Sequence, residues 1–265
     1  MRRAPPPALP PVGSDHFSTV SADYAAYRPQ YPASLFAALA ACAPERTLAW
    51  DCGCGSGQAS VALAEYFDMV HATDVSAAQI AAATAHPRVR YHAAPAQASG
   101  LPTGSVSLVT VAQALHWFDV DAFHEEVRRV LMPGGVIAEW SYALMETPEH
   151  PGVAAVVNAL DTAMRDWWPP ERRHVDTRYA DLPFPFERLT IGEHRMEAHW
   201  TLPQLLGYLG TWSAITRYRA VQGEDPLIAC AEALQRAWPA SPTVHIRWPL
   251  TVRVGRRAAG AMAAG

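Results

Sequence analysis

The chain has 265 residues, 50% hydrophobic and 17% charged, so it can bury a full core as one domain with an insertion or as two small domains. Its formal net charge of -4 and pI near 6.2 show no excess of positive charge of the kind that binds nucleic acid, and they favour small-molecule partners. Four cysteines are too few for a disulfide framework and suit a reducing, cytoplasmic location. No stretch approaches the roughly 18 apolar residues of a membrane span, so no membrane partner is expected.

Residues 1–14 carry two arginines followed by prolines, which predicts a disordered leader rather than a signal peptide. Tyrosines then surround Arg28, and proline pairs keep the chain extended before a helix expected at residues 32–43. The cluster that includes Tyr24 and Arg28 either packs the first helix on a sheet or covers a ligand, and the pattern leaves both interpretations open.

From residue 47 to 142, apolar runs typical of strands alternate with helical runs. Near-continuous apolar strands in such an alternation predict a doubly wound α/β fold, with a parallel sheet covered on both faces. The expected strands are residues 48–51, 69–74, 89–93, 106–112 and 135–142, and the expected helices are residues 57–67, 76–85 and 120–131.

Beyond residue 143 the chain becomes helical and rich in tryptophan, arginine and proline, and strands are expected again near 194–200 and 244–254. Two helical excursions, about 145–185 and 201–240, are expected to rise from the sheet rather than form a separate domain. They would form a lid over the carboxyl ends of the strands, where open α/β sheets bind ligands. One domain, residues 15–255 with a core at 45–142, would then be followed by a frayed tail at 256–265.

A glycine-rich turn lies between the first expected strand and its helix. Asp51 ends the strand, and Gly53, Gly55 and Gly57 follow at alternate positions. Glycine permits positive φ and lets a ligand approach the backbone closely. Gln58 stands where the dinucleotide fingerprint has its third glycine, and no Walker-type Gly-Lys-Ser/Thr follows, so NAD and nucleoside triphosphates are disfavoured.

A carboxylate beside this turn would repel a pyrophosphate but suits the ammonium and sulfonium of S-adenosylmethionine. Asp74 closes the next strand, 23 positions after Asp51, where a carboxylate can accept both ribose hydroxyls. Alternatively, Asp74 caps the helix that follows it.

The turn and four later motifs resemble the class I S-adenosylmethionine-dependent methyltransferases. The motifs are ATDVS at 72–76, APAQASGLP at 94–102, SVSLVTVAQALHWFD at 105–119 and VRRVLMPGGVIAEW at 127–140. YAAYRPQYP and YLGTWSAITRY are similar to the methyltransferase type 11-like subgroup that includes trans-aconitate methyltransferase-like proteins. The resemblance implies a Rossmann-like, seven-stranded, mostly parallel sheet with a helical lid inserted after the fifth strand.

The resemblance also implies a set of cofactor-binding residues. Asp51 and the three glycines would surround the methionine portion, Asp74 would take the ribose hydroxyls, and Tyr24 and Arg28 would close over the cofactor. The remaining members are Val75, Ala96 and Gln97 beside adenine, and Gln113 and Ala114 below the cofactor. Gln97 stands where the family commonly has an acid, and Cys54 where it often has threonine.

His116, just beyond the fourth strand, is the candidate general base or substrate orienter, or else a polar packing residue beside Trp117. Aromatic and arginine side chains of the excursions could enclose a flat or carboxylate-bearing acceptor. They are Trp167, Trp168, Arg172, Arg173, His174, Tyr179, Trp212, Arg217 and Tyr218, for which lid core or a solvated face is the simpler interpretation.

No cysteine or histidine spacing indicates a metal site, and the motif after the fourth strand does not favour a nucleic-acid acceptor. The sequence therefore predicts an enzyme that methylates the oxygen, nitrogen or carbon of a small molecule, with a carboxylate or aromatic acceptor favoured. The alternatives are a non-catalytic adenosylmethionine-binding module and, less favoured, an NAD-dependent oxidoreductase.

Overall fold

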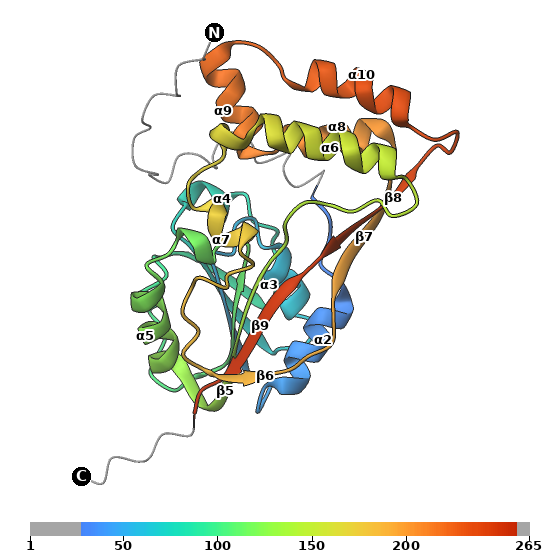
Figure 1. The fold of residues 1–265 in the computed structure, drawn as a ribbon. Coiled ribbons are helices and arrows are strands. Elements are labelled where there is room, and N and C mark those ends of the chain that lie inside the picture. Colours follow the sequence, from blue (N-terminus) through green and yellow to red (C-terminus); the bar gives the residue numbers. More distant parts are fainter. Residues whose placement is uncertain (1–27, 259–265) are drawn as a thin grey trace, which may run out of the picture. The chain divides into compact units, whose positions relative to one another are not determined.

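A computed structural model describes residues 28–258, and its central feature is a seven-stranded sheet in the order β3-β2-β1-β4-β5-β9-β6 (Figure 1). The first five strands pair in parallel, and β9 pairs antiparallel with both β5 and β6. The strands are β1 Leu48–Cys52, β2 Met69–Asp74, β3 Val89–Ala93, β4 Val106–Ala112, β5 Leu131–Ser141, β6 Glu187–Leu189 and β9 Thr251–Arg256. The predicted doubly wound, mostly parallel sheet is confirmed.

The helices between the strands cover both faces of this sheet. Helices α2 (Ala33–Cys42) and α3 (Gln58–Leu63) bury leucine and phenylalanine side chains in one hydrophobic core. Helix α5 (Val120–Val130) packs Phe123 and Val127 into a second core that contains Trp50 of β1. Because β1 and β4 bury side chains in both cores, their sequences are nearly continuous apolar runs.

The described chain divides into two compact units. The sheet unit comprises residues 31–143, 173–195 and 249–258, including α4 (Ala77–Ala81), the 3₁₀ turn η1 (Leu115–Trp117) and most of α7 (Arg172–Asp176). The helical unit comprises residues 28–30, 144–172 and 196–248. Its elements are α6 Pro151–Ala163, η2 Arg165–Trp167, α8 Leu202–Gly210, α9 Ser213–Gln222, α10 Leu227–Ala237 and most of a two-stranded sheet of β7 (Arg195–Trp200) and β8 (Val244–Pro249).

The strand expected at residues 244–254 is in fact two strands that belong to different sheets. Pro249 ends β8 and lacks an N–H group, and the N–H of Leu250 donates to the carbonyl of His194 at 2.9 Å instead of joining a strand ladder. The bounds of β2, β3 and β4 are as predicted, whereas α3 ends at Leu63, four residues earlier than expected.

Residues 173–185, expected in the lid, group with the sheet unit, and the expectation that the helical excursions cover the strand ends stays a prediction. The predicted leader, Tyr24 and most of the predicted tail lie outside the described residues. Among residues 28–258, no helix combines the length and the apolar character that crossing a membrane would require.

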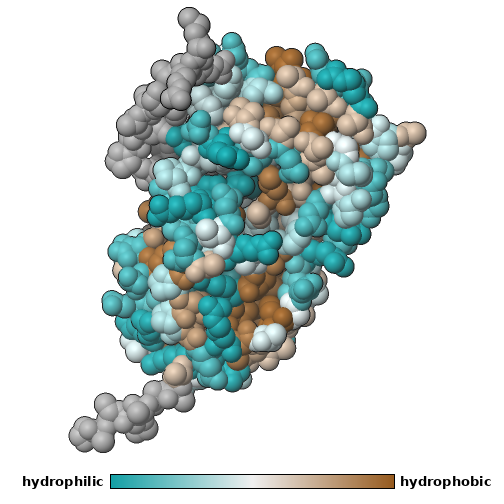
Figure 2. All heavy atoms as spheres, in the orientation of Figure 1, coloured by the Kyte–Doolittle hydropathy of each residue, from teal (hydrophilic) through white to brown (hydrophobic). Residues whose placement is uncertain are grey.

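Hydrophobic side chains reach the surface of the sheet unit beside β9 (Figure 2). The partly buried Leu189, Leu250 and Val252 pack there against the core formed by α2 and α3. This apolar strip therefore extends the first core to the surface.

Candidate functional site

The predicted site lies at the carboxyl ends of β1, β2 and β4. Strand β1 pairs with β2 on one side and β4 on the other, so the strand order reverses direction between β1 and β4. The chain leaves β1 toward α3 and leaves β4 toward η1 and α5, whose side chains enter different cores. Ligands of open α/β sheets bind at such a switch point.

Asp51, near the end of β1, is fully buried. Ser60 of α3 donates its hydroxyl to Oδ2 at 2.5 Å, and Thr110 of β4 donates to Oδ1 at 2.9 Å. Burial is the main cause that raises the pKa of Asp51 to about 6, and the hydroxyl donors oppose this rise. The carboxylate therefore connects β1, α3 and β4 beneath the glycine turn, and its predicted contact with the methionine portion stays a prediction.

We expect Asp51→Asn to change how stability depends on pH. A carboxyl group whose folded pKa of about 6 exceeds its unfolded value of 3.8 binds more protons in the folded state, so its contribution to stability falls as pH rises from 4 to 6. Urea unfolding should show the wild type losing about 1 to 3 kcal/mol relative to the variant between pH 4 and pH 7. Parallel pH curves for the two proteins would contradict this.

The glycines of the turn have different surroundings. Gly53 has φ of +68°, and a Cβ placed there would lie 2.5 Å from Cβ of Ala114, so glycine permits close packing of the turn on the segment after β4. At Gly55, φ is +53° and the described part of the chain offers a Cβ only Gln79 Oε1, at 3.9 Å. At Gly57 the space of a side chain is filled by the hydroxyl of Tyr91. Of the three, Gly55 therefore leaves its backbone open to a ligand.

Asp74 ends β2 beside the same turn. Its Oδ2 accepts the N–H of Gly55 at 2.9 Å, and its Oδ1 accepts the N–H of Ser76 at 2.8 Å. The hydroxyl of Ser76, rather than the carboxylate of Asp74, caps α4 by accepting the N–H of Gln79 at 3.3 Å. Each carboxylate oxygen retains lone-pair capacity for a further donor, so the arrangement is compatible with hydroxyl groups of a ligand.

Val75 and the loop after β3 lie next along this edge. The side chain of Val75 is 66% exposed, so its apolar surface can contact a flat apolar ring. Ala96 is half-buried and Gln97 is exposed, in a loop whose start is tied to β2 by a hydrogen bond from Ala94 N–H to the carbonyl of Asp74 at 3.0 Å.

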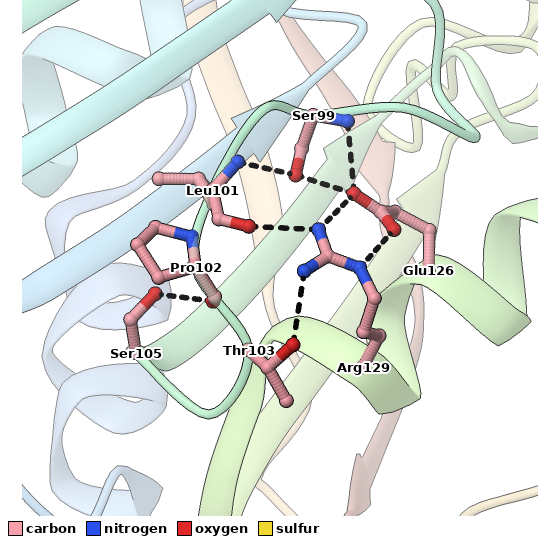
Figure 3. Close-up of polar contacts among 7 residues, drawn as sticks. All are labelled: Ser99, Leu101, Pro102, Thr103, Ser105, Glu126 and Arg129. Atoms are coloured by element: carbon pink, nitrogen blue, oxygen red, sulfur yellow. Dashed lines mark hydrogen bonds and ion pairs between the residues drawn. The ribbon is translucent and has the colours of Figure 1, made fainter.

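Glu126 of α5 holds the far end of that loop (Figure 3). Its Oε1 accepts the N–H of Ser99 at 2.9 Å and the Ser99 hydroxyl at 2.6 Å. Arg129 bonds to both carboxylate oxygens at 2.7 Å and donates to the carbonyl of Leu101 at 2.8 Å. The hydrogen bond from Arg129 is the largest cause that lowers the pKa of Glu126 to about 2, so this anchor stays ionised at neutral pH. Its tertiary partners gave no signal in the sequence.

Gln113 and Ala114 follow β4 directly. Gln113 has φ of +55°, uncommon for a non-glycine residue, and its N–H donates to the carbonyl of Trp140 at 2.9 Å. Its side-chain amide donates to the carbonyl of Tyr142 at 2.8 Å. These bonds to the end of β5 hold a backbone conformation that turns the chain so that Ala114 packs on Gly53.

His116 is half-buried in η1, two residues beyond this contact. Its Nδ1 lies 3.1 Å from the hydroxyl of Tyr179, and its ring tilts against that of Trp117 at a centroid distance of 4.9 Å. The predicted packing on Trp117 and a polar contact are therefore both present. The packing could be predicted from the sequence because Trp117 is the next residue. The contact with Tyr179 could not, because Tyr179 lies 63 residues away in the chain.

A buried charged cluster lies beneath Tyr179. Arg253 of β9 donates to Oε2 of Glu139 in β5 from Nη2 at 2.6 Å and from Nε at 3.1 Å. His124 of α5 lies 2.6 Å from the other oxygen of Glu139, and because a carboxylate only accepts, its Nε2–H is the donor. Residues from three elements thus meet in the sheet unit, a cluster that sequence spacing did not reveal.

Arg28 belongs to the helical unit, where its guanidinium lies 5.7 Å from the ring centroid of Tyr208. Its predicted role over the cofactor therefore stays a prediction. In the same unit, the guanidinium carbon of Arg172 lies 4.0 Å from the ring centroid of Trp168. The ring centroids of Trp168 and Trp212 are 5.3 Å apart. Of the residues expected around an acceptor, these bring cationic and aromatic groups together.

The thiols near the turn are not activated nucleophiles. Burial raises the pKa of both Cys52 and Cys54, so the protonated form is favoured. Within residues 28–258, no group of three or more histidine, cysteine, aspartate or glutamate side chains is placed to bind a metal ion.

These features suit the ligand that the sequence predicted. The open backbone at Gly55, the carboxylate of Asp74 with further acceptor capacity and the exposed apolar face of Val75 fit a ligand with hydroxyls and a flat ring. A pyrophosphate site would be expected to contain lysine or arginine. Neither is among the residues predicted to surround the ligand in the sheet unit.

Comparison with known proteins identifies the family. Residues 50–138 match the family model described as a methyltransferase domain. A Dictyostelium discoideum protein named as a methyltransferase is 32% identical over 259 residues, 95% of this chain and 98% of the relative. A solved structure from Anaeromyxobacter dehalogenans, described as a type II methyltransferase, is 47% identical with a TM-score of 0.82 and covers 88% of this chain and 100% of its own.

A Saccharomyces cerevisiae protein, CRG1, is 30% identical over 140 residues, which are 49% of this chain and 48% of that protein. Its name specifies S-adenosylmethionine-dependent methyl transfer. Together with the fold, these matches favour S-adenosylmethionine over NAD as the cofactor. The chain belongs to the class I S-adenosylmethionine-dependent methyltransferases.

Proposed function

We propose that this enzyme methylates an oxygen, nitrogen or carbon nucleophile of a small molecule that carries a carboxylate or aromatic group. The observation that carries the proposal is the arrangement at the carboxyl end of β2, where Asp74 holds the N–H of Gly55, at which a Cβ would meet only Gln79 Oε1, at 3.9 Å, among the described residues. The acceptor chemistry rests on His116 and on the cationic and aromatic groups of the helical unit.

Each part of the cofactor would meet a different segment of the sheet unit. Gly55 and its neighbours would contact the methionine portion, with Asp51 acting from below as the residue that holds the turn. Asp74 would accept the ribose hydroxyls through its remaining lone pairs. The adenine ring would lie between Val75 and the loop of Ala96 and Gln97, which Glu126 anchors.

When bound, S-adenosylmethionine supplies an electrophilic methyl group on a sulfonium, and the sulfur keeps the electron pair of the broken C–S bond. The protein therefore has to place and desolvate the nucleophile, and to remove a proton only where the nucleophile carries one. We assign His116 the catalytic role, either taking that proton or donating a hydrogen bond that orients the acceptor. Its position beyond β4, close to the Ala114–Gly53 contact, supports this role.

The acceptor class follows from the chemistry of the helical unit. Arginine binds carboxylates through two parallel hydrogen bonds, and tryptophan offers a flat apolar face. Arg172 on Trp168 combines both groups. Burial lowers the pKa of Arg217 in the same unit, which stays a cation because arginine is not deprotonated in proteins. The similarity of residues 24–32 and 208–218 to trans-aconitate methyltransferase-like proteins also favours a carboxylate acceptor.

The test is a transfer assay with labelled S-adenosylmethionine against small carboxylic acids, phenols and amines, with wild type and His116→Asn in parallel. We expect transfer to an acid or a phenol, and a fall in kcat of about 10²- to 10⁴-fold in the variant when the acceptor carries a proton to be removed. Adenosylhomocysteine binding, measured by calorimetry, should be equal in the two proteins. Tight binding with no transfer to any acceptor would instead favour a non-catalytic binding module.

A further inference from the structure

The segment after α7 contains two successive residues in an unfavourable backbone conformation. Arg178 and Tyr179 have φ of 56° and 58°, in the left-handed region that non-glycine residues seldom occupy. Such conformations are unfavourable and persist only where the surroundings enforce them. The N–H of Tyr179 closes the turn by donating to the carbonyl of His174 at 2.7 Å.

Arg253 is the group that enforces this turn. Its Nη1 donates to the carbonyl of Tyr179 at 2.7 Å and to that of Leu182 at 2.9 Å, while Nη2 and Nε hold Glu139. The guanidinium also lies 5.5 Å from the ring centroid of Tyr179. A buried ion pair therefore holds both the backbone and the ring of this tyrosine in place. Burying two charges has a desolvation cost, which a loop held only at the surface would avoid.

The fixed turn places the Tyr179 hydroxyl against His116. The phenol is fully buried, its oxygen lies 3.1 Å from Nδ1 of His116, and the two ring centroids are 6.2 Å apart. Burial raises the pKa of Tyr179 well above its usual value, so the hydroxyl acts as a neutral hydrogen-bonding group rather than as an acid. A second strained residue, Gln113, sets the course of the segment that carries His116.

We propose that Tyr179 is a positioning residue for His116, holding the imidazole through Nδ1 in one orientation and one tautomer, so that Nε2 is the nitrogen that serves the acceptor. The strain at Arg178 and Tyr179, opposed by Arg253 and Glu139, is the structural cost of this contact. The proposal rests on the proposed function, because it takes His116 as the residue that acts on the acceptor.

The hydrogen bond to Nδ1 determines what Nε2 can do. If the phenol donates, Nε2 carries the hydrogen and orients an oxygen of the acceptor. If Nδ1–H donates to the phenol, Nε2 holds the lone pair and takes the proton from the acceptor. In either case this hydrogen bond favours a single tautomer.

The direct test is the nitrogen NMR spectrum of His116 in the full chain with adenosylhomocysteine bound, compared between wild type and Tyr179→Phe. The variant removes only the hydroxyl and keeps the buried ring, and His116→Asn identifies the signals by their loss. We expect the shifts of one tautomer in the wild type and changed His116 nitrogen shifts in Tyr179→Phe. Identical His116 shifts in both proteins would overturn the proposal.

The matched control is Tyr66→Phe, which also removes one hydroxyl from the sheet unit. The Tyr66 hydroxyl donates only to the carbonyl of Ala33, at 3.4 Å, among the contacts of the described chain, and it lies outside the proposed site. We expect its His116 spectrum to match the wild type. A change as large as that in Tyr179→Phe would assign the effect to general loosening and would also overturn the proposal.

Kinetics with the acceptor that the transfer assay identifies provide the second test. We expect Tyr179→Phe to lower kcat about 10- to 100-fold, with KM for S-adenosylmethionine unchanged, and to shift the pH profile of kcat. The charged groups that face Tyr179, namely Glu139 of β5 and Arg253 of β9, are retained in the variant. The double variant with His116→Asn should be no slower than His116→Asn alone, because both changes act through one group.

The two proposals fail in different ways. If no acceptor is methylated, the proposed function fails, while the nitrogen spectrum still decides whether Tyr179 holds His116. If transfer occurs but Tyr179→Phe has the kcat and pH profile of the wild type, the positioning role fails and the proposed function stands.

Discussion

Arg253→Met is expected to lower the free energy of unfolding by about 3 to 5 kcal/mol. The change removes the cation that lies 2.6 Å from Glu139 and leaves a carboxylate with no exposed surface beside a single histidine donor. It also removes the hydrogen bonds to the carbonyls of Tyr179 and Leu182, so the turn at residues 178–179 loses the group that opposes its strain.

Urea unfolding followed by circular dichroism measures this loss. Arg188→Met is the matched control, because Arg188 is exposed on β6 and its guanidinium carbon lies 5.1 Å from the ring centroid of Phe184. Its replacement should change the free energy of unfolding by only about 0.5 kcal/mol. The double variant Glu139→Gln with Arg253→Met should recover part of the lost stability, because no unpaired charge then remains buried. If the two arginine variants lose equal stability, the buried pair does not have the role assigned to it.

The two neighbouring glycines of the turn are expected to respond differently to alanine. In Gly53→Ala, the new Cβ would lie 2.5 Å from Ala114 at a backbone φ of +68°, and we expect a loss of about 2 to 4 kcal/mol in stability. In Gly55→Ala, the Cβ meets no close atom of the described chain, so only the left-handed backbone costs energy, about 1 kcal/mol.

Among folded molecules, Gly55→Ala should weaken ligand binding more than Gly53→Ala does, which is the reverse of their order in stability loss. Because the Cβ of Gly55→Ala would occupy the space proposed for the methionine portion, we expect adenosylhomocysteine to bind at least about 10-fold more weakly, a cost of about 1.4 kcal/mol. Thermal unfolding without ligand and calorimetric titration separate the two effects. Unchanged affinity in Gly55→Ala would place the cofactor elsewhere.

Local sequence patterns were sufficient to predict the sheet that carries the site. Strand β4 has the predicted bounds because it is buried along almost its whole length, which requires a nearly continuous run of hydrophobic residues. Strands β2 and β3 also have the predicted bounds, although β3 lies at the edge of the sheet and is largely exposed. The chain beyond residue 143 was harder to predict. The run from 244 to 254 has one apolar pattern but two strands in different sheets, since the break at Pro249 and Leu250 depends on distant hydrogen-bond partners.

The residues of the site were predictable to different degrees. Asp74 and the glycines follow from their positions after β1 and β2, because parallel strands bring their carboxyl ends to one edge of the sheet. The motif also singled out Asp51, but its full burial beneath the turn depends on Ser60 and Thr110, which come from two other elements. Tyr179 was named among many aromatic residues, without its contact to His116.

By itself, the sequence determined the doubly wound sheet, the glycine turn beside two carboxylates and the class of cofactor, because each depends on residue types at short, regular spacings. Only the tertiary structure decided which of these side chains are buried, and that Tyr179, Glu139 and Arg253 meet beneath His116. The physical reason is the distance along the chain, since 63 residues separate His116 from Tyr179 and 114 separate Glu139 from Arg253. Contacts of that range leave no periodic signal, and they exist only once the sheet has brought β5 and β9 together.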